Sequence, residues 1–180
     1  MKLNKIAYSL FISGVLAGGA AQAATTSVAG GSINFEGQVV DAACAISADS
    51  LNQTVILDQV KAAKLATAGQ VAGQPVAFQI VLSDCDSAVS QNAAVTFSGQ
   101  ADATSADTLA NTAGAGAATN VALQLYGPDG QKLPLGTASS AVTLNEGTNT
   151  LPFSVDYIAT GAAATAGSVA ATATFSMNYS

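Results

Sequence analysis

The chain has 180 residues, of which 5 are Lys or Arg and 11 are Asp or Glu, and it contains no histidine, tryptophan or arginine. Without an imidazole, Ser-His catalysis, Cys-His catalysis and His-ligated metal sites are excluded, and the acidic balance disfavours nucleic acid as a partner. We therefore expect neither an enzyme nor a cofactor or metal site.

Residues 1–23 have the three-part layout of a secretory signal peptide. Two lysines lead into an apolar stretch, and small residues close the segment at Ala21-Gln22-Ala23. The apolar stretch, residues 6–16, is shorter than the roughly 20 residues that a membrane-spanning helix needs. We expect an exported protein that begins at Ala24. Three lysines then remain beside eleven acidic residues, so the formal charge is 3 minus 11, or −8.

Residues 24–37 form a segment that precedes the first cysteine. Gly31, Ile33 and Phe35 share one face of this segment by alternation. Glycine weakens a free strand but allows another backbone to approach closely. From these residues alone, an ordinary first strand and a frayed tail are equally good interpretations.

Cys44 and Cys85 both lie in the part that we expect to be exported. A thiol pair normally oxidises in a periplasm or outside the cell, so these residues are expected to form a disulfide. Closing a loop of about 42 residues stabilises a fold by roughly 4 kcal/mol on the chain-entropy model. Free or metal-binding thiols are the alternative, although the spacing fits no metal motif.

Apolar residues that alternate with a period of two predict a series of half-buried strands. These positions are Val76, Phe78, Ile80 and Leu82; Val95 and Phe97; Val121, Leu123 and Leu125; Leu133 and Leu135; Val142 and Leu144; and Leu151, Phe153, Val155 and Tyr157. Turn residues at 127–130 predict a hairpin, and a second turn is expected at 145–147. Short strands at this spacing point to an all-β sandwich.

Three segments depart from the strand pattern. Residues 58–68 carry a helix-like patch, in which we expect one or two turns at most. Residues 100–120 and 160–168 are rich in Ala, Gly, Ser and Thr, and we expect surface loops because such stretches offer little apolar area to offset ordering entropy. A disordered linker is the alternative for residues 100–120.

Residues 169–180 alternate cleanly between two faces. One face carries Val169, Ala171, Ala173, Phe175, Met177 and Tyr179, and the other carries Ala170, Thr172, Thr174, Ser176, Asn178 and Ser180. An exposed apolar edge strand invites the addition of another chain. An ordinary terminal strand of a closed sandwich is the alternative.

Several stretches resemble the major subunit of type 1 fimbriae and its relatives, the chaperone-usher pilins, over nearly the whole exported chain. They are Asp41-Ala42-Ala43-Cys44, Leu51-Asn52-Gln53-Thr54-Val55, Leu82-Ser83-Asp84-Cys85-Asp86, Ala118-Thr119-Asn120-Val121 and Gly147-Thr148-Asn149-Thr150-Leu151-Pro152-Phe153. A C-terminal signature adds Gly167, fourteenth from the end, alternating apolar residues and a penultimate Tyr179.

The resemblance implies an immunoglobulin-like sandwich over residues 38–180 that lacks its seventh strand. Residues 24–37 would donate the missing strand to another subunit through Gly31, Ile33 and Phe35, which is a form of β-strand addition. A groove beside the C-terminal strand would accept that donor, and a periplasmic chaperone would fill it first. The residues implied for this acceptor groove are Gly167, Val169, Phe175, Met177 and Tyr179.

The resemblance also implies a function, that of a structural major subunit that polymerises by donor-strand exchange into the rod of an adhesive fimbria. Its partners would be identical subunits, a periplasmic chaperone, an outer-membrane usher and other pilins, and it would reach the bacterial surface through the periplasm. A minor or adaptor pilin and a single-domain carbohydrate-binding adhesin are alternatives.

Catalysis is an alternative of a different class, because paired acids can hydrolyse glycosides. Asp84 and Asp86, or Asp102 and Asp107, would be the candidates. Solvated acids near a strand end are the simpler interpretation.

Overall fold

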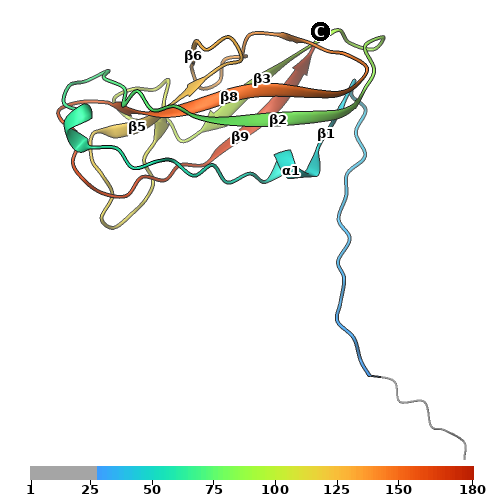
Figure 1. Ribbon diagram of the computed structural model, residues 1–180, viewed down its shortest axis with the longest axis horizontal. Helices are drawn as coiled ribbons and strands as arrows, with labels where there is room; N and C mark the ends of the chain where they lie inside the picture. The colour runs from blue at the N-terminus through green and yellow to red at the C-terminus, as the bar shows by residue number, and fades with distance from the viewer. Residues whose placement is uncertain (1–27) are drawn as a thin grey trace, which may run out of the picture. The chain divides into compact units, whose positions relative to one another are not determined.

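The computed structural model describes residues 28–180, so the predicted signal peptide lies outside the described residues. Contacts within the chain divide it into Met1–Gln38 and Val39–Ser180, and we describe these units separately. In the first unit, residues 28–38 have no regular secondary structure and are exposed (Figure 1).

The second unit is built from two antiparallel sheets (Figure 1). The larger sheet has the order β1-β2-β8-β5-β4, with β6 paired to β5, and the smaller sheet has the order β7-β3-β9. The strands are β1 (Ala45–Ile46), β2 (Val76–Cys85), β3 (Asn92–Gly99), β4 (Leu109–Ala110), β5 (Val121–Tyr126), β6 (Lys132–Leu133), β7 (Val142–Thr143), β8 (Gly147–Ala159) and β9 (Ala173–Tyr179).

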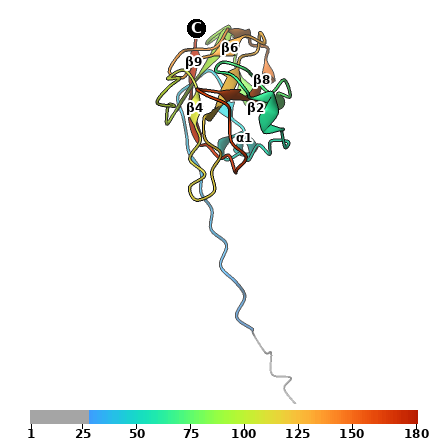
Figure 2. The ribbon, with the colours of Figure 1, turned by 90° about the vertical axis from the view of Figure 1, so that its left-hand side faces the viewer.

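The core lies between the two sheets, which Figure 2 views from one end. Alternate residues of β2 and β8 face inward, and Ile80 and Leu151 are almost completely buried. From the smaller sheet, Val95 and Phe97 meet them, and the rings of Phe97 and Phe153 pack edge to face with centroids 5.1 Å apart. The predicted period-two strands therefore exist because each one buries one face against the opposite sheet.

The predicted hairpin is confirmed. Leu125 pairs with Leu133 and Tyr126 pairs with Lys132, and the turn between them closes with a bond from Gly130 N to Gly127 O of 2.9 Å. Gly130 has a φ of +72°, which glycine adopts without steric cost. The second predicted turn leads from β7 in one sheet to β8 in the other, so it connects the two layers.

Helices are few in the described part of the chain. Within the helix-like patch at 58–68 there is a single 3-10 turn, Ala62–Lys64, and a further turn, α1 (Ala48–Leu51), was not expected from the sequence. A helix of four residues is too short to show a 3.6-residue period, which explains why the pattern did not reveal it. None of the helices in residues 28–180 has the length and apolar character to cross a membrane.

The disordered-linker interpretation of residues 100–120 is wrong, and the surface-loop interpretation is incomplete. This segment contains β4, whose Leu109 pairs with Leu123 and is buried in the core. Asp102 shapes the preceding loop, because its carboxylate accepts the backbone N–H groups of Thr104 and Ser105 at 2.9 and 3.1 Å. One isolated leucine among small residues produces no periodicity, so its burial could not be read from the pattern.

Candidate site, an open groove beside the last strand

A groove of about 690 Å³ opens along the second unit between the chain after α1 and the start of β9. Its floor is apolar and belongs to the core, with Phe78, Ile80 and Leu123 among its residues. One side is formed by Leu51, Asn52, Gln53, Thr54, Val55 and Leu57, and the other by Ala171, Thr172, Ala173, Thr174 and Phe175. The core is therefore accessible along one line of the sandwich.

The backbone of β9 has one edge without a partner strand in the described chain. Asn92 and Ser180 exchange both of their backbone bonds, at 2.9 and 3.0 Å, and such pairs alternate along an antiparallel ladder. The even-numbered residues of β9 therefore bond to β3. The N–H and C=O groups of Ala173, Phe175, Met177 and Tyr179 point to the other edge, because β9 is the last strand of its sheet.

The side chains of Phe175, Met177 and Tyr179 are half-buried and pack against the core. The Phe175 ring lies 6.2 Å from that of Phe97, measured between centroids. The Tyr179 hydroxyl donates to the carbonyl oxygen of Cys44 at 3.3 Å, and burial raises the pKa of this phenol. These three side chains thus extend the hydrophobic core to the open edge of β9.

The structure places Gly167 and Val169 before β9 begins. The predicted strand covers residues 169–180, but β9 starts only at Ala173. Ala170 instead accepts a bond from Thr112 N at 2.8 Å and donates to the Asn111 side chain at 3.0 Å. A side chain in place of a backbone partner interrupts the regular ladder, and this explains the shorter strand.

Gly167 and Val169 line a second cavity of about 260 Å³, at the end where β8 finishes. Gln59, Val60, Leu65 and Tyr157 also border it. Burial raises the pKa of the Tyr157 phenol, and the carboxylates of Asp58 and Asp156 raise it further.

Gly167 is expected to tolerate no side chain, because its α-carbon lies against the backbone of residues 116–118. A Cβ at this position would meet Ala118 N, Ala117 C at 2.6 Å and Gly116 O at 2.7 Å. We predict that Gly167→Ala lowers the free energy of unfolding by about 1–3 kcal/mol. Denaturant titration measures this effect. Gly161→Ala is the matched control, since its Cβ would meet no atom closer than 3.4 Å, and equal losses in the two variants would contradict the prediction.

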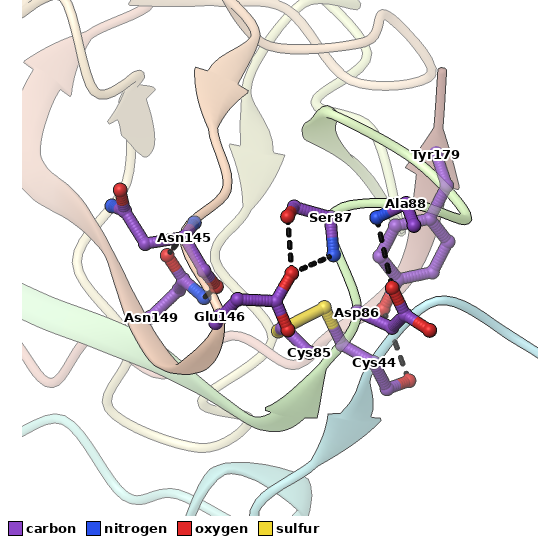
Figure 3. The surroundings of a disulfide bond; sticks show 9 residues. All are labelled: Cys44, Cys85, Asp86, Ser87, Ala88, Asn145, Glu146, Asn149 and Tyr179. Atoms are coloured by element: carbon purple, nitrogen blue, oxygen red, sulfur yellow. Dashed lines mark hydrogen bonds between the residues drawn. A yellow bond between two sulfur atoms is a disulfide. The ribbon is translucent and has the colours of Figure 1, made fainter.

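The predicted disulfide between Cys44 and Cys85 is confirmed (Figure 3). Their Cα atoms are 4.1 Å apart, and both residues are buried. The bond joins the residue before β1 to the last residue of β2. The disulfide therefore fixes the start of the second unit to the end of β2.

Hydrogen bonds fix the loops around the disulfide (Figure 3). The Glu146 carboxylate accepts the hydroxyl and the N–H of Ser87, and these two bonds lower the pKa of Glu146. Asn149 bonds to the backbone of Asn145 through both ends of its amide, at 2.9 and 2.7 Å. The Ser87–Glu146 bonds connect the loop after β2 to the turn before β8, and the Asn149 bonds hold that turn against the start of β8.

The four acids considered for catalysis lie in two separate regions. Asp84 has a φ of +52° at a β-bulge, and the carboxylate of Asp86 accepts the N–H of Ala88 at 2.8 Å. Asp107 offers its backbone oxygen to Leu135 N at 3.2 Å. Asp86 and Asp102 thus organise loop backbone, and no group of three metal-ligating side chains occurs in residues 28–180.

Gly31, Ile33 and Phe35 belong to the unit Met1–Gln38. The side chains of Ile33 and Phe35 are 77% and 89% exposed, and no side chain added at Gly31 would meet another atom within 4 Å. Their role as a donor stays a prediction.

The sequence did not reveal the side of the groove opposite β9, because residues 51–57 mix apolar and polar side chains without a strand or helix period.

A family model described as "Fimbrial protein" matches residues 33–180. The type-1 fimbrial protein A chain of Escherichia coli strain K12 is 46% identical over 183 residues, which cover 99% of this chain and all of that protein. The fimbrial subunit type 1 of Klebsiella pneumoniae shows the same identity over the same length and coverage.

Solved structures agree with the architecture. A chaperone-usher pilus structure that concerns rod uncoiling matches with a TM-score of 0.71 and 30% identity, over 88% of this chain and 100% of that chain. The crystal structure of the P pilus rod subunit PapA matches with a TM-score of 0.64 and 28% identity, over 77% and 100%. The predicted all-β fold, an immunoglobulin-like sandwich that lacks a strand, is confirmed. The chain belongs to the fimbrial protein family.

Proposed function

We propose that this chain is the major, rod-forming subunit of a chaperone-usher fimbria and that it polymerises by donor-strand exchange. The observation that supports this most directly is the unpaired edge of β9 beside an apolar groove. An extended segment placed there would bond to the free backbone groups of β9 and bury its side chains on the groove floor. The likeness to PapA, described as a rod subunit, supports the rod role over that of a minor pilin.

The donor that we propose is residues 24–37 of another copy, with Gly31, Ile33 and Phe35 on the inserted face. Ile33 and Phe35 are exposed, and burying an apolar side chain of this size contributes about 1.5–3 kcal/mol. Two of them together contribute about 3–6 kcal/mol, which is a large part of the stability of a small domain. A subunit with an empty groove should therefore be much less stable than one with a donor strand.

The same open groove provides the reason for assembly partners. An exposed apolar edge strand pairs with wrong chains unless it is covered. In our proposal a periplasmic chaperone covers the acceptor groove after export, and an outer-membrane usher receives the complex and releases the subunit into a fimbria on the cell surface. The chain then acts as a building block, without catalysis or a cofactor.

Electron microscopy of cells with and without the chain tests the rod role. Filaments that disappear when the chain is deleted, and return when it is supplied again, support a rod subunit. Filaments that persist with altered length would contradict the rod role and favour a minor pilin.

Phe175→Ala is expected to weaken the acceptor groove. The Phe175 ring lines the groove and packs against Phe97, so its removal takes about 1.5–3 kcal/mol of apolar contact from an inserted strand. This corresponds to a roughly 10- to 150-fold weaker joint. The yield of chaperone–subunit complex and the dissociation of polymers in denaturant measure the effect. Ser176→Ala, on the outer face of β9, is the control, and an unchanged yield for Phe175→Ala would count against the acceptor role.

A further inference from the structure

The side of the groove opposite β9 is formed by residues 51–57. We call residues 52–60, which continue to the second cavity at Gln59 and Val60, the wall segment. Its residues Gln53, Thr54, Val55 and Leu57 line the groove. Residues 54–60 make no hydrogen bond to any other residue of the described chain. The wall segment therefore keeps its position through its two ends and through the apolar contacts of Val55, Leu57 and Val60.

Two side chains replace backbone pairing at the start of the wall segment. The last backbone bond between this part of the chain and β2 runs from Ser47 N to Val81 O, at 3.0 Å. Beyond it, the Ser50 hydroxyl accepts Val81 N at 2.9 Å, and the Gln53 side-chain amide donates to Gln79 O at 2.6 Å. Ser50 is only 3% exposed, so its bond is protected from water. These side chains bond the edge of β2 that β1 pairs with farther along.

The side-chain bonds of Ser50 and Gln53 set the distance between the wall segment and β2. A strand that pairs by its own backbone lies about 4.8 Å from its neighbour, whereas a glutamine side chain holds the main chain farther away. The wall segment is thus attached to β2 without occupying the ladder position beside it. At its other end the next attachment is the bond from Ala164 N to Leu65 O, at 2.9 Å.

We propose that Ser50 and Gln53 are positioning residues that fix the wall segment at the distance an inserted strand requires. The inference rests on the proposed donor-strand function and adds which residues hold the second side of the groove. An inserted strand can bond to the wall segment only if the free backbone of residues 54–60 is held in place. Without the two side-chain bonds, insertion must also order the wall segment, and ordering backbone costs conformational entropy.

The test uses polymers of the full exported chain and compares two pairs of variants. Gln53→Glu keeps the size of the side chain but replaces the amide donor with a carboxylate, which only accepts hydrogen bonds. Gln131→Glu makes the same charge change on the exposed turn before β6 and is the matched control. Ser50→Ala removes the acceptor of Val81 N, and Ser50→Thr retains a hydroxyl. The rate at which subunits leave the polymer in denaturant is measured for each.

We expect Gln53→Glu and Ser50→Ala each to dissociate about 3- to 10-fold faster than wild type, as the loss of one hydrogen bond predicts. Gln131→Glu and Ser50→Thr should dissociate at close to the wild-type rate. Amide hydrogen exchange of the same polymers separates positioning from general destabilisation. Amides of residues 54–60 should exchange faster in Gln53→Glu, while those of the β2·β8 ladder, such as Ile80, keep their wild-type rates.

Two results overturn the positioning role while the proposed function stands. The first is that the wild-type chain polymerises and the Gln53→Glu polymer dissociates at the same rate as the Gln131→Glu polymer. The other is equal acceleration of exchange in the wall segment and in the β2·β8 ladder. A wild-type chain that forms no polymer would overturn the proposed function, and the positioning role with it.

Discussion

A chain that lacks residues 24–35 is expected to fold and to accept a donor strand, but to donate none. The deletion leaves the unit Val39–Ser180 complete, including both sheets, the disulfide and the groove. It removes Ile33 and Phe35, whose exposed side chains make no contribution to the buried core. The stability of the domain should therefore stay within about 0.5 kcal/mol of wild type, as is usual for changes at exposed positions.

The effect on assembly should be complete. Without a donor, a subunit can occupy one end of a polymer but can fill no neighbour's groove, so cells that make only this variant should carry no filaments. Electron microscopy and recovery of the chaperone–subunit complex measure the two halves of the prediction. The paired change Ile33→Asp and Phe35→Asp should act like the deletion, whereas Ser32→Asp and Asn34→Asp, on the other face, should act less strongly. Filaments of normal length from the deleted chain would refute the donor assignment.

The sequence predicted those elements that bury one face and expose the other. Strands β2, β3 and β8 alternate along most of their length, because each packs one side against the opposite sheet. The pattern fails where both faces are covered. Near the end of β8, the consecutive residues Val155 and Asp156 are both buried, and so are Ile158 and Ala159. The Asp156 carboxylate accepts the N–H groups of Gly73 and Gln74 at 2.8 and 3.2 Å.

The groove could be predicted from one side only. Its β9 side has a periodic sequence, which identified Phe175 as a lining residue and predicted that Met177 and Tyr179 share its face. The wall segment has no period, because its backbone makes no ladder that would force alternation, and side-chain bonds from Ser50 and Gln53 hold it. Such bonds depend on the position of β2 in the folded domain. They are therefore visible in the structure and not in the sequence pattern.

Removal of the disulfide is expected to have the largest effect on stability. Cys44 and Cys85 are 41 residues apart, and opening a loop of about 42 residues lowers the free energy of unfolding by roughly 4 kcal/mol on the chain-entropy model. Small domains have only about 5–15 kcal/mol in total. The double variant Cys44→Ala, Cys85→Ala avoids a lone free thiol. Both sites are buried, and alanine suits them because it has no polar group that would need a partner.

The effect of this double variant should depend on whether the groove is filled. A binding partner that recognises only the folded state stabilises it in proportion to its affinity. The double variant and its disulfide-bonded counterpart are both made in the chain that lacks residues 24–35, so that no copy can fill the groove of another. The double variant should then be largely unfolded, and a synthetic peptide with the sequence of residues 24–37 should restore its folded circular dichroism spectrum. The same chain with its disulfide should be folded with and without the peptide, and should gain thermal stability when the peptide is added. A peptide with Ile33 and Phe35 replaced by Asp is the control.

Two outcomes would contradict this expectation. If the double variant without peptide is as stable as the same chain with its disulfide, the loop that the disulfide closes does not limit folding. If the variant is unfolded and the peptide leaves it unfolded, the groove does not gain enough from residues 24–37 to offset the lost cross-link. The expected result, rescue by the wild-type peptide alone, follows because about 3–6 kcal/mol from the two buried donor side chains is of the same size as the roughly 4 kcal/mol that the disulfide supplies.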